Sequence, residues 1–494
     1  MENLSPDIPK WGFAEVLTIS APASMSGLNR VVTQFVDGRM ISHLGSATVV
    51  GQAMGGLVAF MLESFARGVL SVVNTFVSQN LGAGRFRRCS QYTWAGLMLV
   101  CLFAAVLCPL SLAAGPLFAL LKHEAEVQPM EVIYFRYMIL SAPLALAIRA
   151  LEGFFYGVHR PGLVFKVSLL ASLLNVFGNW VLIFGKFHLP EMGLHGAGIA
   201  SVASWAMQLL ILSCLFLSNR FHKKYGTRMA RAAKIKHCRQ ILRIGLPSGG
   251  SFFIDIATWT FFMTVLVGHF GKLHMAAASH AMRYMRISFI PAIGIGIAAT
   301  VLVGRYIGQG RRDLARRRAY AALITAMIYM GLCGLAFVLF RRPMLGLFVN
   351  IKGAAYSPAE SAEIIAIGGR ILLCMAVFQL GDAVNIVLSG TLRGAGDTRW
   401  PMWATAISSI LVLVVGGKLA VTFLPQLDSI GPFAAAAVNC FVLAVALAIR
   451  FESGKWRKID LLTTRPGAAA APRPAPVSPP TVITVDRPGQ DQEE

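Results

Sequence analysis

Apolar runs of about 20 residues, nearly free of charge, recur throughout this 494-residue chain. A run of that length lets an α-helix cross the hydrocarbon core of a bilayer. Hydrophobic residues make up 56% of the chain and charged residues only 14%, which is more apolar than a soluble core requires. Because polar and apolar residues do not alternate within the runs, a transmembrane β-barrel is excluded. The pattern predicts an all-α integral membrane fold.

Twelve transmembrane helices account for these runs. We expect them at residues 14–40, 47–72, 92–115, 131–156, 163–185, 196–218, 241–267, 276–303, 319–340, 364–391, 401–422 and 432–450.

A repeated segment divides the twelve spans into two sets of six. The stretch VSQNLGAGRFRR at 77–88 returns as VGRYIGQGRRDL at 303–314. Other landmarks recur in step: Pro22 and Pro247, Gly153 and Gly390, Gly157 and Gly394. Six spans per half is an even number, so both halves enter the membrane in the same orientation. We therefore expect two six-helix lobes related by a pseudo-two-fold axis along the membrane normal, with a substrate between them. The glycines of LGAGR and IGQGR are expected to let the chain turn sharply at the ends of two spans.

Basic residues concentrate on one side of the predicted membrane topology. Nine Lys or Arg and no acid lie in 220–243, and five Arg lie in 311–318. The loops on the other side, 186–196 and 423–431, are nearly free of both residue types. Positive loops stay in the cytoplasm, so both termini should be cytoplasmic. The net charge of +22 then indicates contact with anionic membrane lipids rather than nucleic acid.

The expected domain organisation follows from these spans. It comprises a cytoplasmic N-terminus at 1–13, an N-lobe at 14–218, a basic cytoplasmic linker at 219–240, a C-lobe at 241–451, and a disordered Pro/Ala-rich tail at 452–494. The N-terminus lacks the basic start of a signal peptide. Eight Cys without a C-x-x-C pair and ten His without ligand spacing indicate neither disulfides, nor a metal centre, nor a cofactor.

Several motifs, in order and in both halves, resemble a known family. They are FVDGRMISHLG at 35–45, VSQNLGAGRFRR at 77–88, LLNVFGNWVLIFG at 173–185, GLHGAGIAS at 193–201 and LSGTLRGAGDTRWP at 388–401. Over residues 14–450 the chain resembles the multidrug and toxic compound extrusion (MATE) transporters, most closely the NorM-like branch. The resemblance implies a monomer in the bacterial inner membrane that exports organic solutes by alternating access, coupled to inward flow of Na⁺ or H⁺.

Ionisable residues inside apolar spans are functional candidates, because each costs about 2.5–3.5 kcal/mol at a helix centre. Asp37 is the first, and the resemblance implies a place in an N-lobe cation site. Asn175 and Asn179 are four residues apart and share one helix face. Their amide oxygens beside a carboxylate suit an alkali cation such as Na⁺. Two other interpretations remain open: Asp37 pairs with Arg30, or the amides only join helices.

In the second half, Asp255 and Asp382 match acidic residues of the NorM-like branch and are C-lobe coupling candidates. Phe378, one turn before Asp382, stands where that branch has a tyrosine, and a phenyl ring offers no oxygen to Na⁺. Phe378 is nevertheless a candidate for lining the substrate cavity, and the other cavity candidates are Gln34, Glu63, Arg283 and Arg286.

The intramembrane arginines leave two interpretations open. Arg283 or Arg286 pairs with Asp255, as Arg149 would pair with Glu152, or both bind an anionic substrate through bidentate contacts.

The leading functional hypothesis is therefore an antiporter for amphipathic cationic drugs. Its alternatives are an exporter of an anionic metabolite or siderophore-like product and a lipid-linked-sugar flippase. An integral-membrane enzyme is disfavoured because H-E-x-x-H, G-x-S-x-G and P-loop motifs do not occur in the sequence.

Overall fold

A computed structural model describes residues 12–120, 124–229, 233–349 and 357–462. The first half consists of α1 (Phe13–Ile41), α2 (Ser46–Leu70), α3 (Val73–Gly82), α4 (Phe86–Leu107), α5 (Ala114–Leu120), α6 (Val127–Gly157), α7 (Pro161–Ile183) and α8 (Gly193–Leu217). The short helix α9 (Asn219–Tyr225) follows. The second half consists of α10 (Ile235–Phe261), α11 (Lys272–Gly308), α12 (Arg312–Val349), α13 (Pro358–Ala395), α14 (Arg399–Ser408), α15 (Gly417–Phe423) and α16 (Ile430–Glu452).

Eleven helical segments of the described chain are long and apolar enough to cross a membrane. They correspond to eleven of the twelve predicted spans, and the all-helical, multi-span fold is thereby confirmed. Helix α1 is not among the eleven, although it has 29 residues. Its second half carries Asn29, Arg30, Gln34 and Asp37, which lower its mean hydropathy.

The repeated sequence produces repeated backbone geometry. Gly45 and Gly271, each just before a helix, have φ of 102° and 88°. Gly84 and Gly310, in the two copies of the repeated motif, have φ of 70° and 75°. Only glycine adopts such angles without a steric penalty, so Gly84 and Gly310 make the predicted sharp turns. The prediction of turns is confirmed for these two motif glycines.

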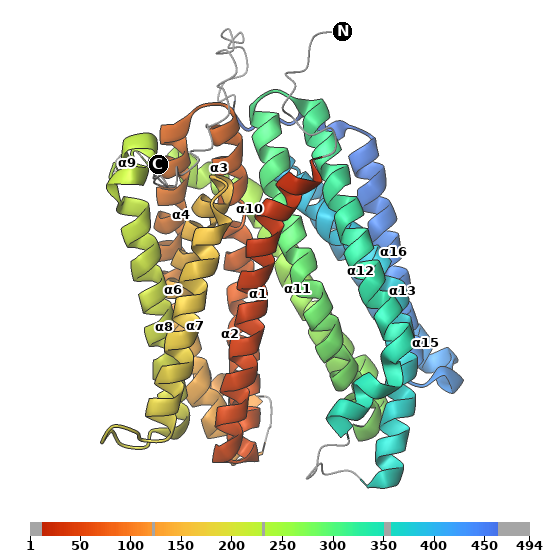
Figure 1. Ribbon diagram of the computed structural model, residues 1–494. Coiled ribbons are helices and arrows are strands. Elements are labelled where there is room, and N and C mark those ends of the chain that lie inside the picture. Colours follow the sequence, from red (N-terminus) through yellow and green to blue (C-terminus); the bar gives the residue numbers. More distant parts are fainter. Residues whose placement is uncertain (1–11, 121–123, 230–232, 350–356, 463–494) are drawn as a thin grey trace, which may run out of the picture. The chain divides into compact units, whose positions relative to one another are not determined.

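Two buried clusters hold the helices together. One contains residues from both halves, such as Val69 and Val77 with Val303 and Leu388. The other belongs to the second half alone and includes Phe262, Phe378 and Phe433. The halves therefore share a core along part of their length only. In Figure 1, α1 and α11 run side by side at one end and lie apart at the other.

The chain beyond α16 remains packed for another ten residues. Lys455–Lys458 forms a 3-10 helix in which Trp456 is buried. Its indole stacks on Phe451 with ring centroids 5.5 Å apart and donates a hydrogen bond to the Phe451 carbonyl. The start of the predicted tail at 452 is thus part of the fold as far as Leu462. The rest of the predicted tail, and residues 1–11 of the predicted N-terminus, lie outside the described residues.

Candidate ion-coupling sites and inter-half contacts

Asp37 and the two asparagines are brought together by the packing of α1 against α7. The Asn179 Nδ2 donates to Asp37 Oδ1 at 2.6 Å. In the amide orientation that satisfies both ends of its side chain, Asn175 also donates to the two Asp37 oxygens, at 2.9 and 3.2 Å. A hydrogen bond from Asn29 Nδ2 to Ser172 Oγ, 2.7 Å long, joins the same two helices. The predicted cluster is therefore a contiguous group of side chains.

The cluster has one oxygen that makes no hydrogen bond. Asn179 Oδ1 is buried and has no partner among the described residues. Tyr134 on α6 is also buried and close enough to Asp37 for an electrostatic interaction. Tyr134 was not expected from the sequence, because it is one of several aromatic residues within apolar spans. The amide donors thus satisfy the carboxylate, while rotation of the amides would present two oxygens beside it.

The second-half candidates form a smaller group around Asp382 on α13. Cys440 Sγ on α16 donates to Asp382 Oδ1 at 3.4 Å, and Asp255 on α10 is close enough to interact electrostatically with Asp382. Cys440 was not expected from the sequence, because an isolated cysteine in a span carries no signal. Phe378 is completely buried, with its ring centroid 6.5 Å from that of Trp259. Its ring is therefore part of the hydrophobic core beside Asp382.

The intramembrane ion pairs differ in part from those expected. Arg149 Nη1 lies 3.4 Å from Glu152 Oε2, which confirms that pair. Arg30 lies 3.9 Å from the same Glu152, so its predicted pair with Asp37 is wrong. Glu152 is buried and binds both arginines, so Arg30 pairs with Glu152 and not with Asp37. Asp37 is left to the amide groups.

Glu63, a predicted cavity residue, is buried and pairs with Arg67 one turn later at 2.5 Å.

In the second half, Arg283 and Arg286 are both exposed. Within the described residues no ion pair joins Arg286 to Asp255, so the interpretation that pairs these two residues is wrong. Asp255 is exposed and lies on α10, whereas the two arginines lie on α11.

Beyond their contact, α1 and α11 expose polar faces. The helices touch where Gly27 meets Ile290 and where Gly294 meets Ser24. Arg283 lies two turns before Ile290 on the same face of α11. On α1, Gln34 lies two turns beyond Gly27 and is exposed. Gln34 and Arg283 therefore belong to the faces that diverge beyond the contact.

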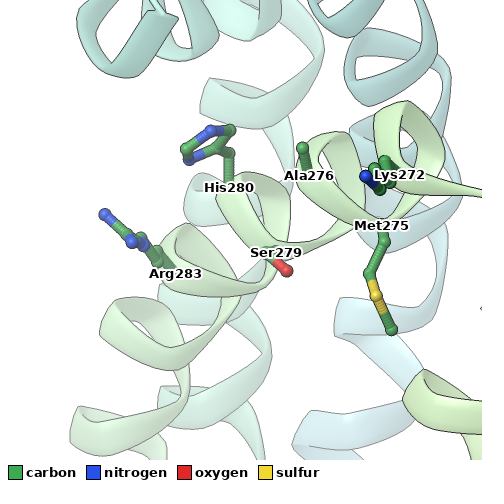
Figure 2. Close-up of a pocket in the computed structure, with 6 residues that line it drawn as sticks. All are labelled: Lys272, Met275, Ala276, Ser279, His280 and Arg283. Carbon is green, nitrogen blue, oxygen red and sulfur yellow. The ribbon is translucent and has the colours of Figure 1, made fainter. Parts of the chain in front are cut away.

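A shallow cavity of about 350 Å³ lies along the start of α11. Its lining includes Lys272, Met275, His280 and Arg283. Figure 2 shows the His280 and Arg283 side chains pointing to the same side of α11. This part of α11 is consequently basic.

At the opposite end of the molecule the two halves are joined by polar contacts. Gln79 Nε2 on α3 donates to the Gly394 carbonyl on α13 at 2.8 Å, and Thr75 Oγ1 donates to the Arg393 carbonyl at 3.1 Å. Glu15 on α1 forms an ion pair with Arg318 on α12 at 2.7 Å. The halves are thus bonded at the end that carries the basic turns.

The protein has many helical spans, two repeated halves, carboxylates within its spans, and bonds between the halves at one end. This is the construction of a secondary transporter. The MatE family model matches residues 22–181 and 247–417. The chain belongs to this family of MATE transporters and is a membrane transport protein, not an enzyme.

The chain is similar to proteins named as bacterial multidrug resistance proteins. A probable multidrug resistance protein NorM of Pseudomonas syringae pv. tomato is 26% identical over 472 residues, covering 92% of this chain and 97% of the relative. The multidrug resistance protein MdtK of Edwardsiella ictaluri is 24% identical, covering 88% and 94%.

Solved structures share the fold. A MOP superfamily transporter from Pyrococcus furiosus, whose description reports a binding pocket of reversed polarity, has a TM-score of 0.82 at 17% identity, covering 93% of this chain and 100% of that one. A multidrug resistance MATE transporter in an outward-facing conformation has a TM-score of 0.81 at 18% identity, covering 90% and 96%.

Proposed function

We propose that the protein is a cation-coupled antiporter that exports amphipathic organic cations by alternating access, as a monomer in the bacterial inner membrane. The observation that carries this proposal is the Asp37 cluster, in which two asparagines of α7 hold a carboxylate of α1 inside a span. Family membership and the multidrug relatives support export of drug-like compounds. Inward flow of Na⁺ or H⁺ at this cluster would supply the energy.

The Asp37 cluster can respond to either coupling ion. A proton would neutralise Asp37 and weaken the charge-assisted hydrogen bond from Asn179, and thereby loosen α1 from α7. For Na⁺, rotation of the amides would add oxygens from Asn175 and Asn179 to those of the carboxylate, and oxygen is the ligand that alkali cations prefer. The Asn179 Oδ1, which accepts no hydrogen bond from the described residues, favours such a rotation.

Asp382 and Asp255 form our proposed second coupling site, in the C-lobe. Asp382 has a weak thiol donor in Cys440, and Phe378 supplies no oxygen. A proton, which needs no further ligands, suits this site better than Na⁺. Glu63, Gln34, Arg283 and Arg286 would face or support the substrate path, whereas the core position of Phe378 limits it to packing.

In the transport cycle that we propose, α1 also crosses the membrane and brings the number of spans to twelve. These spans form two six-helix lobes at 14–218 and 241–451. The lobes would rock about a substrate site between them. The bonds between the halves lie at the basic end, which the positive-inside rule assigns to the cytoplasm. The structure would then correspond to the state that opens outward.

Transport by purified protein in proteoliposomes tests the proposal. Efflux of a cationic dye is measured under an imposed Na⁺ gradient and, separately, an imposed H⁺ gradient. Asp37→Asn should abolish coupled efflux, because it removes the only carboxylate of the cluster and preserves its volume. Asp428→Asn, the same change in a loop outside the cluster, is the matched control and should transport normally. Normal coupled efflux by Asp37→Asn would refute the assignment.

A second candidate function, export of an organic anion, is favoured by the exposed Arg283 and Arg286. If they bind an anion, Arg286→Gln should weaken transport of a carboxylate-bearing dye while leaving transport of the cationic dye and thermal stability unchanged. Equal effects on both dyes would argue for a structural role.

A further inference from the structure

A second cavity, of about 610 Å³, lies at the start of α12 and is lined largely by arginines. Its walls come from the turn at 310–311, from the first two turns of α12, and from the 3-10 helix that follows α16. Four arginines contribute to it: Arg311, Arg312, Arg317 and Arg457. Asp313 is the only carboxylate in the lining, so the cavity has three excess positive charges.

The folded structure uses only part of the arginine run at 311–318. Arg316 pairs with Glu452, and Arg318 pairs with Glu15. In the described part of the chain, Arg311, Arg312 and Arg317 make no ion pair. The two arginines that bind carboxylates hold helices together, and the other three line the cavity.

The carboxylate of the cavity compensates little of this charge. Asp313 lies 3.8 Å from Arg457, but its side chain is 92% exposed. A pair so exposed is weakened by solvent and salt. Arg457 Nε is buried and has no hydrogen-bond partner among the described residues. The cavity therefore holds an excess of like charges, which a bound anion would neutralise.

The geometry of the donors suits a tetrahedral oxyanion. The first N–H groups of α12 have no partner within the helix and lie at its positive end. Arginine side chains add paired N–H donors that match two oxygens of a phosphate. Because these donors come from two segments, one bound phosphate would bridge the start of α12 and the chain after α16.

The cavity lies at the end of membrane-spanning helices, where lipid phosphates are found. It follows directly on α11 and lies beside the end of α16. Arg450, on the last turn of α16, has its guanidinium 5.4 Å from the ring centroid of Trp400, which is 42% exposed. Exposed tryptophans are typical of the membrane–water interface.

We propose that this cavity binds the phosphate group of an anionic ligand, and its position favours the headgroup of an anionic phospholipid. Basic pockets at the cytoplasmic ends of spans bind such headgroups by the same charge pairing. The site is separate from the Asp37 and Asp382 clusters and does not depend on the transported substrate.

Thermal unfolding of the purified full-length chain in detergent tests this site. The probes are dioctanoyl phosphatidylglycerol, dioctanoyl phosphatidylcholine and inorganic phosphate, each titrated separately. The cavity variant is Arg311→Gln/Arg317→Gln. The matched control is Arg220→Gln/Arg239→Gln, which removes the same charge from exposed positions of the same end outside the cavity.

Phosphatidylglycerol should raise the Tm of the wild type and of the control at much lower concentration than phosphatidylcholine does. The cavity variant should need roughly thirtyfold more phosphatidylglycerol, because each arginine near an anionic headgroup contributes about a factor of five. If inorganic phosphate stabilises the wild type at the same concentrations as phosphatidylglycerol, and the cavity variant loses that effect, the ligand is a soluble phosphate compound.

Without any probe, the cavity variant should be as stable as the wild type or more so, because repulsion between like charges is relieved. If it is less stable, Arg312→Gln, at an exposed position, repeats the test with an expected loss of about fivefold. An identical response of wild type and cavity variants to every probe, or an equal loss in the control, would overturn the proposal.

Discussion

The Arg318 guanidinium is fully buried, with no exposed surface. Its Nε donates to Glu15, and its Nη atoms have no hydrogen-bond partner among the described residues. Tyr306 donates to the same carboxylate, and the guanidinium carbon lies 5.5 Å from the Tyr306 ring centroid. One carboxylate thus compensates a buried cation and joins the two halves.

Glu15→Gln should destabilise the protein by roughly 3–5 kcal/mol, because it leaves the buried guanidinium without a counter-charge. Glu452→Gln is the matched control, since its ion pair with Arg316 is 48% and 41% exposed. A pair of that exposure contributes about 0–1 kcal/mol. Chemical unfolding in detergent measures both variants. Equal losses would contradict the special role of Glu15.

His159 occupies the turn between α6 and α7 and has φ of 59°. Burial of its ring, together with nearby Arg305 and Arg160, lowers its pKa to about 3. The residue reaches the surface in part, but Nε2 is buried without a hydrogen bond within the described chain. The neutral imidazole is therefore the form that fits this turn.

Stability should fall as the pH decreases from about 6.5 towards 3, because in that window the unfolded chain protonates His159 and the folded chain does not. One such group gives a slope of up to about 1.4 kcal/mol per pH unit. His159→Asn, which tolerates a positive φ, should remove this part of the slope. His188→Asn is the control, because His188 is exposed with φ of 62°. An unchanged slope in His159→Asn would contradict the assignment.

At the scale of elements, the two copies of the repeated motif cross one another. A Cβ added to Gly82 would lie 2.0 Å from the Arg305 carbonyl oxygen, and one added to Gly308 would lie 2.1 Å from that of Gln79. Gly82 corresponds to Gly308 in the repeat, and Gln79 corresponds to Arg305. The contact is therefore reciprocal, as expected about a two-fold axis. These glycines allow α3 and α11 to approach closely, whereas Gly84 and Gly310 form the turns.

Gly308→Ala should destabilise this closed contact by about 1–3 kcal/mol, the usual cost of overpacking. Transport should slow, since the halves would close less readily at this end. Gly162→Ala, where a Cβ meets nothing within 4 Å, is the control and should leave activity unchanged. Dye efflux and thermal unfolding measure both variants. Wild-type efflux in Gly308→Ala would show that this approach is not needed for transport.

At the scale of the whole molecule, the orientation of the chain in the membrane remains a prediction of its charge distribution. We expect a cysteine at Gln426 to react with an impermeant thiol reagent in intact cells, and one at Asn219 to react only after the cells are opened. Both positions are exposed. Replacement of the exposed Cys101 and Cys214 lowers the background. Labelling of the Asn219 position in intact cells would reverse the topology.

Local patterns in the sequence predicted the fold class, and the resemblance of its motifs to a known family predicted the Asp37 cluster. Apolar length specifies a spanning helix in any context. Asn175 and Asn179 share a face as a result of helix periodicity, and their recognisable motif relates them to Asp37. Sequence repetition likewise predicted the turns at Gly84 and Gly310.

The partner that each charged or polar group takes depends on how the helices pack. Arg30 was expected to pair with Asp37, seven residues later on nearly the same helix face, but Glu152 approaches it from α6. Cys440 reaches Asp382, and Glu15 reaches Arg318, across sequence separations of 58 and 303 residues. Such contacts depend on how helices pack and on which competing partner is nearest, and neither is encoded in spacing along one helix. The distribution of Lys and Arg in the sequence predicted that one end of the molecule is basic. Which of these arginines bind carboxylates and which line a cavity depends on how the helices pack.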